Sequence, residues 1–155
     1  MLQILKKTLI ELNVNGEMKT VAVRPSDTLL YALREGLGLT GAKSGCDNGD
    51  CGTCTVIVDG IPIKACIMLA AEAIGHEITT VEGLRNTPIQ DAFLETFAYQ
   101  CGFCTPGFIM NCHALTTNYP DADDEMIHEW LESNLCRCTG YEEIKDAVKT
   151  VLKNS

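Results

Sequence analysis

The chain has 155 residues, of which 46% are hydrophobic and 21% are charged. This composition is typical of one folded domain or two small ones, and it excludes a disordered or fibrous protein. The formal net charge of −9 argues against a nucleic-acid-binding surface, which would be basic. No segment has the roughly 18 consecutive apolar residues of a membrane span, and residues 1–11 lack an apolar export signal. We therefore expect a cytoplasmic protein that binds no nucleic acid and does not insert into a membrane.

Strands are predicted in the first half of the chain. Residues 8–14 alternate apolar and polar side chains, as a half-buried strand does. The dipeptide Asn15-Gly16 then fits a type I′ hairpin turn, whose two central residues have positive φ angles. A small α+β sheet with one covering helix is the expected result. The remaining predicted elements are a returning strand at 18–23, a helix at 28–35 and short strands at 55–58, 61–64 and 78–81.

The second half changes to helical periodicity. Pro88 and Pro106 each follow a threonine and stand where a helix would begin, the position at which proline is favoured. A third helix is expected after Asp123 or Asp124, and a fourth after Thr139, because these side chains can cap a helix N-terminus. Four short helices predict a small bundle.

The two halves are expected to form two domains. The periodicity changes at residues 83–86, which predicts boundaries of 1–82 and 83–155. Ile89, Phe93 and Phe97 recur at helical spacing and would face the core of the second domain. Each half is small for a self-sufficient hydrophobic core, and domains of this size often depend on a bound metal or a partner.

Cysteine is the unusual component of this sequence, with nine residues. Without an export signal, patterned cysteines are more often metal ligands or catalytic groups than disulfides. Cys46, Cys51 and Cys54 have the C-x4-C-x2-C spacing of plant-type [2Fe–2S] sites, and Cys66 follows the next hairpin. The intervening glycines allow a tight loop with inward-pointing N–H groups. A zinc site usually takes its cysteines from two separate short pairs of the C-x2–4-C type, so zinc fits this spacing less well.

A second set lies in the predicted bundle. Two interhelical loops can meet at one end of a four-helix bundle and close a site of four thiolates. The spacing alone favours neither zinc nor iron there, and a redox-active thiol pair is a third reading. Cys112 lies within a predicted helix and is expected to be a buried structural thiol. The residues of the second set are Cys101, Cys104, Cys136 and Cys138.

Three segments carry a resemblance to a known family: residues 46–54 (CDNGDCGTC), 100–107 (QCGFCTPG) and 135–141 (LCRCTGY). Together they resemble the small iron–sulfur subunit of the molybdenum hydroxylases, the xanthine dehydrogenase/oxidase family. The resemblance extends over about residues 8–152. It implies an N-terminal plant-type ferredoxin-like β-grasp domain followed by a C-terminal four-helix-bundle [2Fe–2S] domain.

The resemblance also implies a set of cofactors and contacts. One [2Fe–2S] cluster would be held by Cys46, Cys51, Cys54 and Cys66, nearer a flavin, and a second by Cys101, Cys104, Cys136 and Cys138, nearer molybdenum. Gln100 and Cys138 match positions that contact the molybdopterin, expected in its cytosine dinucleotide form. Molybdopterin would lie on a large partner subunit and FAD on a medium one, in a hetero-oligomer that can dimerise.

The resemblance thus implies an electron-transfer subunit with no catalytic residue of its own. Electrons would pass from a partner's molybdenum site through two clusters to FAD. We expect the substrate to be an N-heteroaromatic such as nicotinate; subunits of xanthine, aldehyde, CO or hydroxybenzoyl-CoA enzymes are alternatives. A free-standing two-cluster ferredoxin, whose acidity would suit basic partners, and a colourless zinc adaptor remain as hypotheses from other classes.

Overall fold

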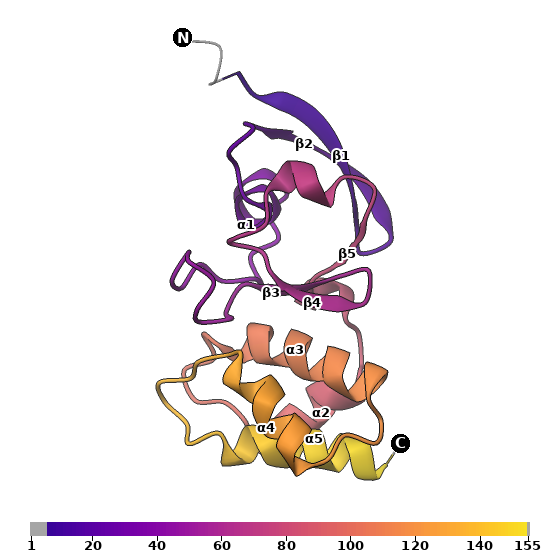
Figure 1. The fold of residues 1–155 in the computed structure, drawn as a ribbon, viewed down its shortest axis with the longest axis vertical. Helices are drawn as coiled ribbons and strands as arrows, with labels where there is room; N and C mark the ends of the chain where they lie inside the picture. The colour runs from indigo at the N-terminus through magenta and orange to yellow at the C-terminus, as the bar shows by residue number, and fades with distance from the viewer. Residues whose placement is uncertain (1–5, 155) are drawn as a thin grey trace.

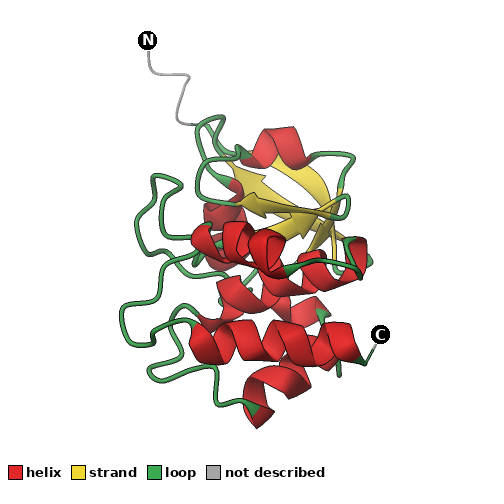
Figure 2. Cartoon of the chain, turned by 60° about the horizontal axis from the view of Figure 1, so that its bottom comes forward, coloured by secondary structure: helices red, strands yellow, loops and turns green. Residues whose placement is uncertain are grey.

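A computed structural model describes residues 6–154. The N-terminal half contains a five-stranded sheet, and the C-terminal half contains the four helices α2 to α5 (Figure 1). Figure 2 shows the same division, with the strands in one half and long loops gathered along one side of the molecule. Among residues 6–154, no helix is long and apolar enough to cross a membrane. The sheet in the first half and the helices in the second confirm the expected α+β architecture.

The sheet is mixed, with strand order β2-β1-β5-β3-β4. β1 and β2 form the predicted hairpin, and Asn15 and Gly16 have φ angles of 55° and 78°, as the turn type requires. β5 pairs parallel with β1 and antiparallel with β3, so it joins the two hairpins into one sheet. The strands are Thr8–Val14 (β1), Glu17–Val23 (β2), Thr55–Val58 (β3), Ile61–Lys64 (β4) and Glu77–Thr79 (β5).

Two predicted elements of this half differ in the structure. The helix expected at 28–35 is a short α-helix, Leu29–Tyr31 (α1), that continues as a π-helical turn, Ala32–Gly36. The turn ends at Gly36, which lies against β2, where a Cβ would collide with the side chain of Val21. The strand expected at 78–81 ends at Thr79, because Val81–Gly83 forms a 3-10 turn.

The four helices of the second half are Pro88–Glu95 (α2), Thr105–Asn118 (α3), Asp124–Glu132 (α4) and Glu142–Lys153 (α5). Of the two predicted caps for α4, Asp123 and Asp124, the structure uses Asp123. Its side chain accepts a hydrogen bond from Met126 N at 2.9 Å. The prediction that Thr139 caps α5 was wrong. Its N–H instead donates to the sulfur of Cys136 at 3.3 Å, and α5 begins after Tyr141.

The expectation that Phe97 faces the core was also wrong, since its side chain is 73% exposed. Helix α2 ends before it, and Phe97 takes a left-handed conformation with φ 54°. Ala98 N–H bonds to Phe93 O and Phe97 N–H to Leu94 O, which is the Schellman arrangement for ending a helix.

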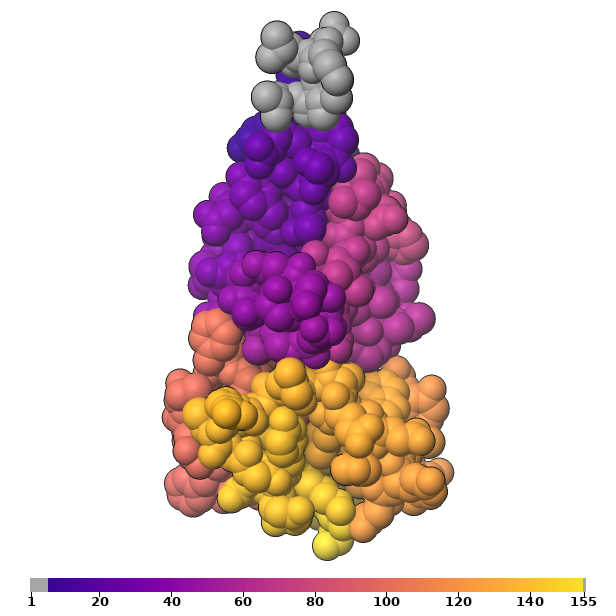
Figure 3. All heavy atoms as spheres, turned by 60° about the vertical axis from the view of Figure 1, so that its left-hand side comes forward, coloured from indigo at the N-terminus to yellow at the C-terminus, as the bar shows by residue number. Residues whose placement is uncertain are grey.

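The two halves meet along one interface, visible in Figure 3 where the indigo-to-magenta half rests on the orange-to-yellow half. Helix α3 packs against β3 and β4 there. Ile57, Met110 and Ala114 form a small buried apolar cluster between the halves. The helices are therefore fixed relative to the sheet, and so are the loops at their ends.

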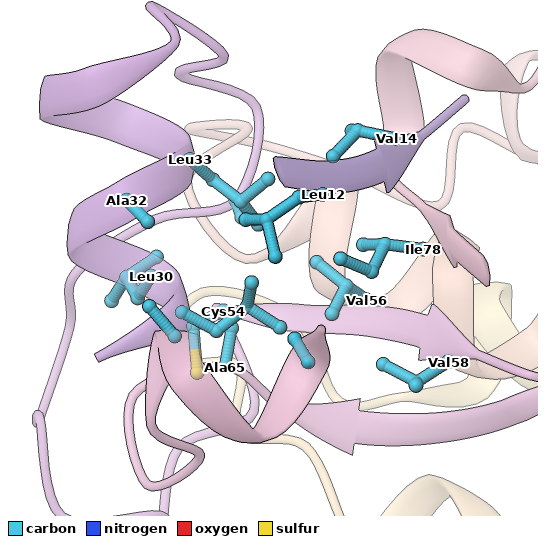
Figure 4. Packing of buried hydrophobic residues seen from close by; sticks show 14 of the residues in the cluster. Leu12, Val14, Leu30, Ala32, Leu33, Cys54, Val56, Val58, Ala65 and Ile78 are labelled. Carbon is cyan, nitrogen blue, oxygen red and sulfur yellow. The ribbon is translucent and has the colours of Figure 1, made fainter. Parts of the chain in front are cut away.

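Each half also has its own apolar core. In the N-terminal half, Leu12, Val56 and Ile78 pack beneath the α1 segment, and Cys54 belongs to the same core (Figure 4). In the C-terminal half, Phe93 and Phe108 are the largest fully buried side chains. The predicted thiol Cys112 lies in this second core and is fully buried.

Candidate metal centres

Eight of the nine cysteines lie outside the helices and strands, and Cys112 lies in α3. Two contacts show that these loops approach one another. The sulfur atoms of Cys101 and Cys138 are 3.6 Å apart although the residues are 37 apart in sequence. Leu135 N–H donates to Cys51 O at 2.9 Å across the interface between the halves.

Cys46 and Cys51 form one pair of sulfurs in the first set. Cys51 N–H donates to Cys46 Sγ at 3.3 Å, and the Cys51 side chain also contributes to lowering the pKa of Cys46. Backbone N–H groups of Asn48 and Cys51 lower the pKa of the Cys46 thiol to about 7. The loop thus offers inward N–H groups that stabilise negative charge on sulfur.

Glycine is required where this loop is tightest. A Cβ on Gly45 would lie 2.8 Å from Cys51 Sγ and 2.6 Å from Thr53 Oγ1. Gly49 has φ 89°, a left-handed conformation that disfavours other residues. These positions let the backbone close around the sulfur atoms, as the sequence predicted.

Cys54 and Cys66 form the second pair of the first set. Both side chains are nearly buried, at 2% and 6% exposed, and the Cys66 side chain contributes to raising the pKa of Cys54. Burial raises the pKa of the Cys54 thiol to about 12. In this apolar site a thiolate needs a neighbouring positive charge, which a coordinated metal supplies.

The second set also consists of two pairs. Cys101 and Cys138 are exposed, and contact with the Cys101 side chain raises the pKa of Cys138. Cys104 and Cys136 are half-buried, and the Cys136 side chain contributes to raising the pKa of Cys104. Burial raises the pKa of Cys104 to about 12.

Cys136 lies in a polar backbone environment. Burial alone would raise its pKa, but hydrogen bonds donated by Thr139 and Cys138 outweigh that effect and lower the pKa. Its own N–H donates to the hydroxyl of Tyr141 at 2.9 Å. That contact ties the cysteine loop to the start of α5.

Both sets have the donor chemistry of a two-metal cluster. Two sulfurs on one tetrahedral metal with bonds of about 2.3 Å lie about 3.8 Å apart, close to the 3.6 Å between Cys101 and Cys138. Within the described residues, no three His, Cys, Asp or Glu side chains converge on one ion position. A [2Fe–2S] cluster needs only two sulfurs on each iron, so paired thiols suit it.

Two buried hydroxyls beside the second set support this fit. Thr105 Oγ1 has no hydrogen-bond partner among residues 6–154, and the Thr139 hydroxyl meets no geometric hydrogen bond there, although it lies close enough to the sulfur of Cys136 to lower that thiol's pKa. Thr105 follows Cys104 and Thr139 follows Cys138. Buried hydroxyls normally find an acceptor, and sulfurs of a bound cluster would provide one.

Gln100, one of the predicted cofactor contacts, lies on the surface of the molecule. Gln100 is exposed and precedes the exposed Cys101. Gln100 and the Cys101–Cys138 sulfur pair therefore face outward together, where a partner could reach them. Sequence reasoning missed Asn134, a buried residue at the interface between the halves, because a single asparagine after a helix looks like an ordinary cap.

The chain matches the models of two protein families. The "2Fe-2S iron-sulfur cluster binding domain" matches residues 12–77, and the "[2Fe-2S] binding domain" matches residues 80–149. The first covers most of the sheet and the first cysteine set, and the second covers most of the four helices and the second set. The fold and paired thiols thus define a two-cluster iron–sulfur protein.

Named relatives narrow this class. The nicotinate dehydrogenase small FeS subunit of Eubacterium barkeri is 46% identical over 149 residues, covering 94% of this chain and 95% of the relative. The nicotine 6-hydroxylase small subunit of Paenarthrobacter nicotinovorans is 46% identical, covering 90% and 86%. Quinoline 2-oxidoreductase from Pseudomonas putida 86 superposes with a TM-score of 0.90 at 40% identity, covering 96% and 95%.

The chain belongs to the small iron–sulfur subunits of the molybdenum hydroxylases. Two [2Fe–2S] clusters are its cofactors. It is an electron-transfer subunit that works with larger partner subunits, as expected from the sequence. The zinc adaptor hypothesis is therefore wrong.

Proposed function

We propose that this chain relays electrons from a molybdopterin site on a large partner subunit to FAD on a medium partner subunit. Cys46, Cys51, Cys54 and Cys66 hold one cluster, and Cys101, Cys104, Cys136 and Cys138 hold the other. A [2Fe–2S] cluster supplies one-electron redox chemistry, while the protein sets its potential through hydrogen bonds, charge and burial. We place domain boundaries at 1–82 and 83–155 and the protein in the cytoplasm.

The observation that carries the proposal is the pairing of sulfurs. The sulfurs of Cys101 and Cys138 lie 3.6 Å apart. The side chains of Cys51, Cys66 and Cys136 contribute to the pKa of Cys46, Cys54 and Cys104, respectively, which indicates the other three pairs. Each pair can serve one iron, so two pairs make one cluster site. The two sites are also joined through Leu135 N–H and Cys51 O, which suits transfer between them.

The electrons for the relay come from oxidation of the substrate on the large partner subunit. Hydroxylation of a C–H group to C–OH, with water supplying the oxygen, releases two protons and two electrons, and the electrons leave one at a time through this chain. Gln100 and Cys138 are the proposed contacts to molybdopterin in its cytosine dinucleotide form, because they lie at the outward edge of the second site. We further propose a dimerised hetero-oligomer.

The proposed substrate class is an N-heteroaromatic such as nicotinate. The support is the relatives, whose names refer to nicotinate, nicotine and quinoline. Electron transfer itself does not require the small subunit to touch substrate. The substrate is therefore tested on the assembled enzyme, by comparing reduction of its flavin by nicotinate with reduction by xanthine and by an aldehyde.

EPR spectroscopy of the dithionite-reduced, assembled enzyme tests the ligand assignment. We expect two distinct [2Fe–2S] signals that together approach two spins per chain. Cys104→Ser should remove or weaken one signal and stop flavin reduction by substrate. Cys112→Ala is the matched control, since Cys112 is buried in the helical core and should leave both signals intact. Unchanged flavin reduction in Cys104→Ser, or a cluster lost in Cys112→Ala, would contradict the assignment.

A further inference from the structure

Asn134 is a buried polar residue at the interface between the halves. Its side chain is 1% exposed, and it lies between the end of α4 and the segment that carries Cys136. Nδ2 donates to Gly52 O at 2.9 Å, and Oδ1 accepts from Ser133 Oγ at 2.8 Å. This asparagine therefore joins the loop of the second cysteine set to the loop of the first.

Gly52 is held from two sides by the C-terminal half. It follows Cys51 directly and has φ 69°. A Cβ on Gly52 would lie 2.6 Å from Asn134 Nδ2, and a Cβ on Gly107 would collide with Gly52 O. Gly107 is three residues after Cys104. Side-chain and backbone contacts from both segments of the second set thus meet at this one peptide.

The adjacent peptide provides a short link between the two sets. Leu135 N–H donates to Cys51 O at 2.9 Å. Cys51 belongs to the first set, and Leu135 is bonded directly to Cys136 of the second. A single hydrogen bond therefore completes an otherwise covalent path from one set to the other. Electron tunnelling falls steeply with distance, and such a path couples two sites better than a van der Waals gap.

We propose that Asn134 is a positioning residue for electron transfer between the two cluster sites. By holding Gly52, it keeps Cys51 O against Leu135 N–H and so sets the electronic coupling between the sites. This inference rests on the proposed function, which supplies the two clusters. Asn134 touches no cysteine sulfur through a hydrogen bond among the described contacts, so its effect acts through the backbone.

The surroundings indicate that the link can be weakened without unfolding the protein. Gly52 O also accepts hydrogen bonds from Thr55 N at 3.1 Å and from Thr55 Oγ1 at 2.7 Å. The single proton of Ser133 Oγ is shared between Asn134 Oδ1 and Trp130 O, each 2.8 Å away. Replacing Asn134 with leucine, which has a similar shape, therefore leaves neither group without a partner.

Asn111 offers a matched control. It is also buried, at 3% exposed, and its Nδ2 donates to the backbone carbonyl of Trp130 at 2.7 Å. Trp130 O also lies 2.8 Å from Ser133 Oγ, whose proton can turn to it. The Asn111 bond joins α3 to α4 within the C-terminal half and does not touch Gly52 or Cys51. Asn111→Leu thus reproduces the loss of a buried amide without disturbing the link.

The test compares Asn134→Leu, Asn111→Leu and the unaltered chain in the assembled enzyme. Spin quantitation by EPR first establishes that two clusters are present. Laser-flash photoreduction with a deazaflavin then gives the rate at which an electron redistributes between the clusters, and low-temperature EPR gives the magnetic splitting between the reduced clusters. Thermal unfolding reports the loss of stability of each variant.

For Asn134→Leu we expect two spins per chain, a smaller magnetic splitting and redistribution slowed by about tenfold or more, the scale at which outer hydrogen-bond partners affect metal sites. Asn111→Leu should lose comparable stability but keep the rate and splitting. A rate within twofold of the unaltered chain in Asn134→Leu, or equal slowing in Asn111→Leu, overturns the proposal. Fewer than two spins in the unaltered enzyme would instead count against the proposed function.

A second variant covers the case in which leucine is not tolerated. Asn134→Ser is smaller than the native residue and cannot overfill the site. It should keep both clusters and slow redistribution as Asn134→Leu does. If both variants lose a cluster, Asn134 is a structural residue of the metal site, and the positioning role is refuted.

Discussion

A methyl group added to Gly52 tests how tightly the two halves fit together. Gly52 has φ 69°, and a Cβ there would lie 2.6 Å from Asn134 Cγ and 2.7 Å from the backbone oxygen of Ser133. Alanine in a left-handed conformation costs about 1 kcal/mol. Crowding in a packed interior costs about 1–3 kcal/mol more. We therefore expect Gly52→Ala to lose about 2–4 kcal/mol of stability.

Gly60→Ala is the matched control, because Gly60 has φ 81° but no atom within 4 Å of an added Cβ. It carries the backbone cost alone, about 1 kcal/mol. For a chain of this size, 1 kcal/mol corresponds to a change of about 2–4 °C in the unfolding midpoint. We expect a decrease of about 2–4 °C for Gly60→Ala and about 4–16 °C for Gly52→Ala.

The assay is thermal unfolding of the cluster-loaded enzyme at one fixed scan rate, since unfolding with cluster loss is a kinetic measurement. Iron content is measured before each scan, so that both variants start with their clusters. Equal decreases in the two variants would refute the reasoning, because they would mean that Asn134 and Ser133 move away from Gly52 at no cost.

Three further predictions follow from individual contacts. Tyr141→Phe removes the acceptor of the Cys136 N–H and should cost about 1–3 kcal/mol; in EPR, one cluster signal should decay faster under a chelator while the other is unchanged. Phe93→Ala empties a site that is 1% exposed and should cost about 3–5 kcal/mol, measured by the unfolding midpoint. Burial lowers the pKa of His113, so the unfolded chain binds its proton more readily and stability should fall as pH drops below about 6.5. His113→Gln should reduce that decrease between pH 7 and 5, and an identical pH profile would contradict this account.

Local signals in the sequence predicted most of the secondary structure. Asn15-Gly16 and Asp59-Gly60 carry their turn geometry in the residues themselves, and both turns have positive φ angles in the structure. Pro88 and Pro106 mark the starts of α2 and α3 because proline fixes its own φ. These elements depend on residues that are adjacent in the chain.

The errors lie where distant contacts decide the conformation. The π-helical turn ends at the close approach of Gly36 to Val21 in β2, which no local pattern shows. Thr139 has the chemistry of a cap, but its N–H is used by Cys136 instead. Phe97 continues an apolar spacing, yet α2 ends before it in a Schellman arrangement. Periodicity identifies a helix better than it identifies its last residue.

The same distinction applies to the metal sites. Cysteine spacing was enough to divide eight thiols into two sets of four, because the first set lies largely on one loop. The pairing of sulfurs within each set depends on how loops from different helices meet, and Cys101 and Cys138 come together only in the folded chain. Asn134 was missed for the same reason, since its partner Gly52 is 82 residues away.

The sulfur pairs of the second cysteine set differ in how exposed they are, and this difference indicates which side of the molecule would face a partner. In the second set, Cys101 and Cys138 face outward, whereas Cys104 and Cys136 are half-buried, and Cys136 lies next to the residue that bonds to Cys51. A partner that covers Cys101 and Cys138 would therefore lie on the side of the second cysteine set that is away from the first set. Each reduced cluster adds negative charge to a chain that already has a net charge of −9. Covering the outward edge removes water that solvates this charge, so the remaining hydrogen bonds, which are stronger in a lower dielectric, must stabilise it.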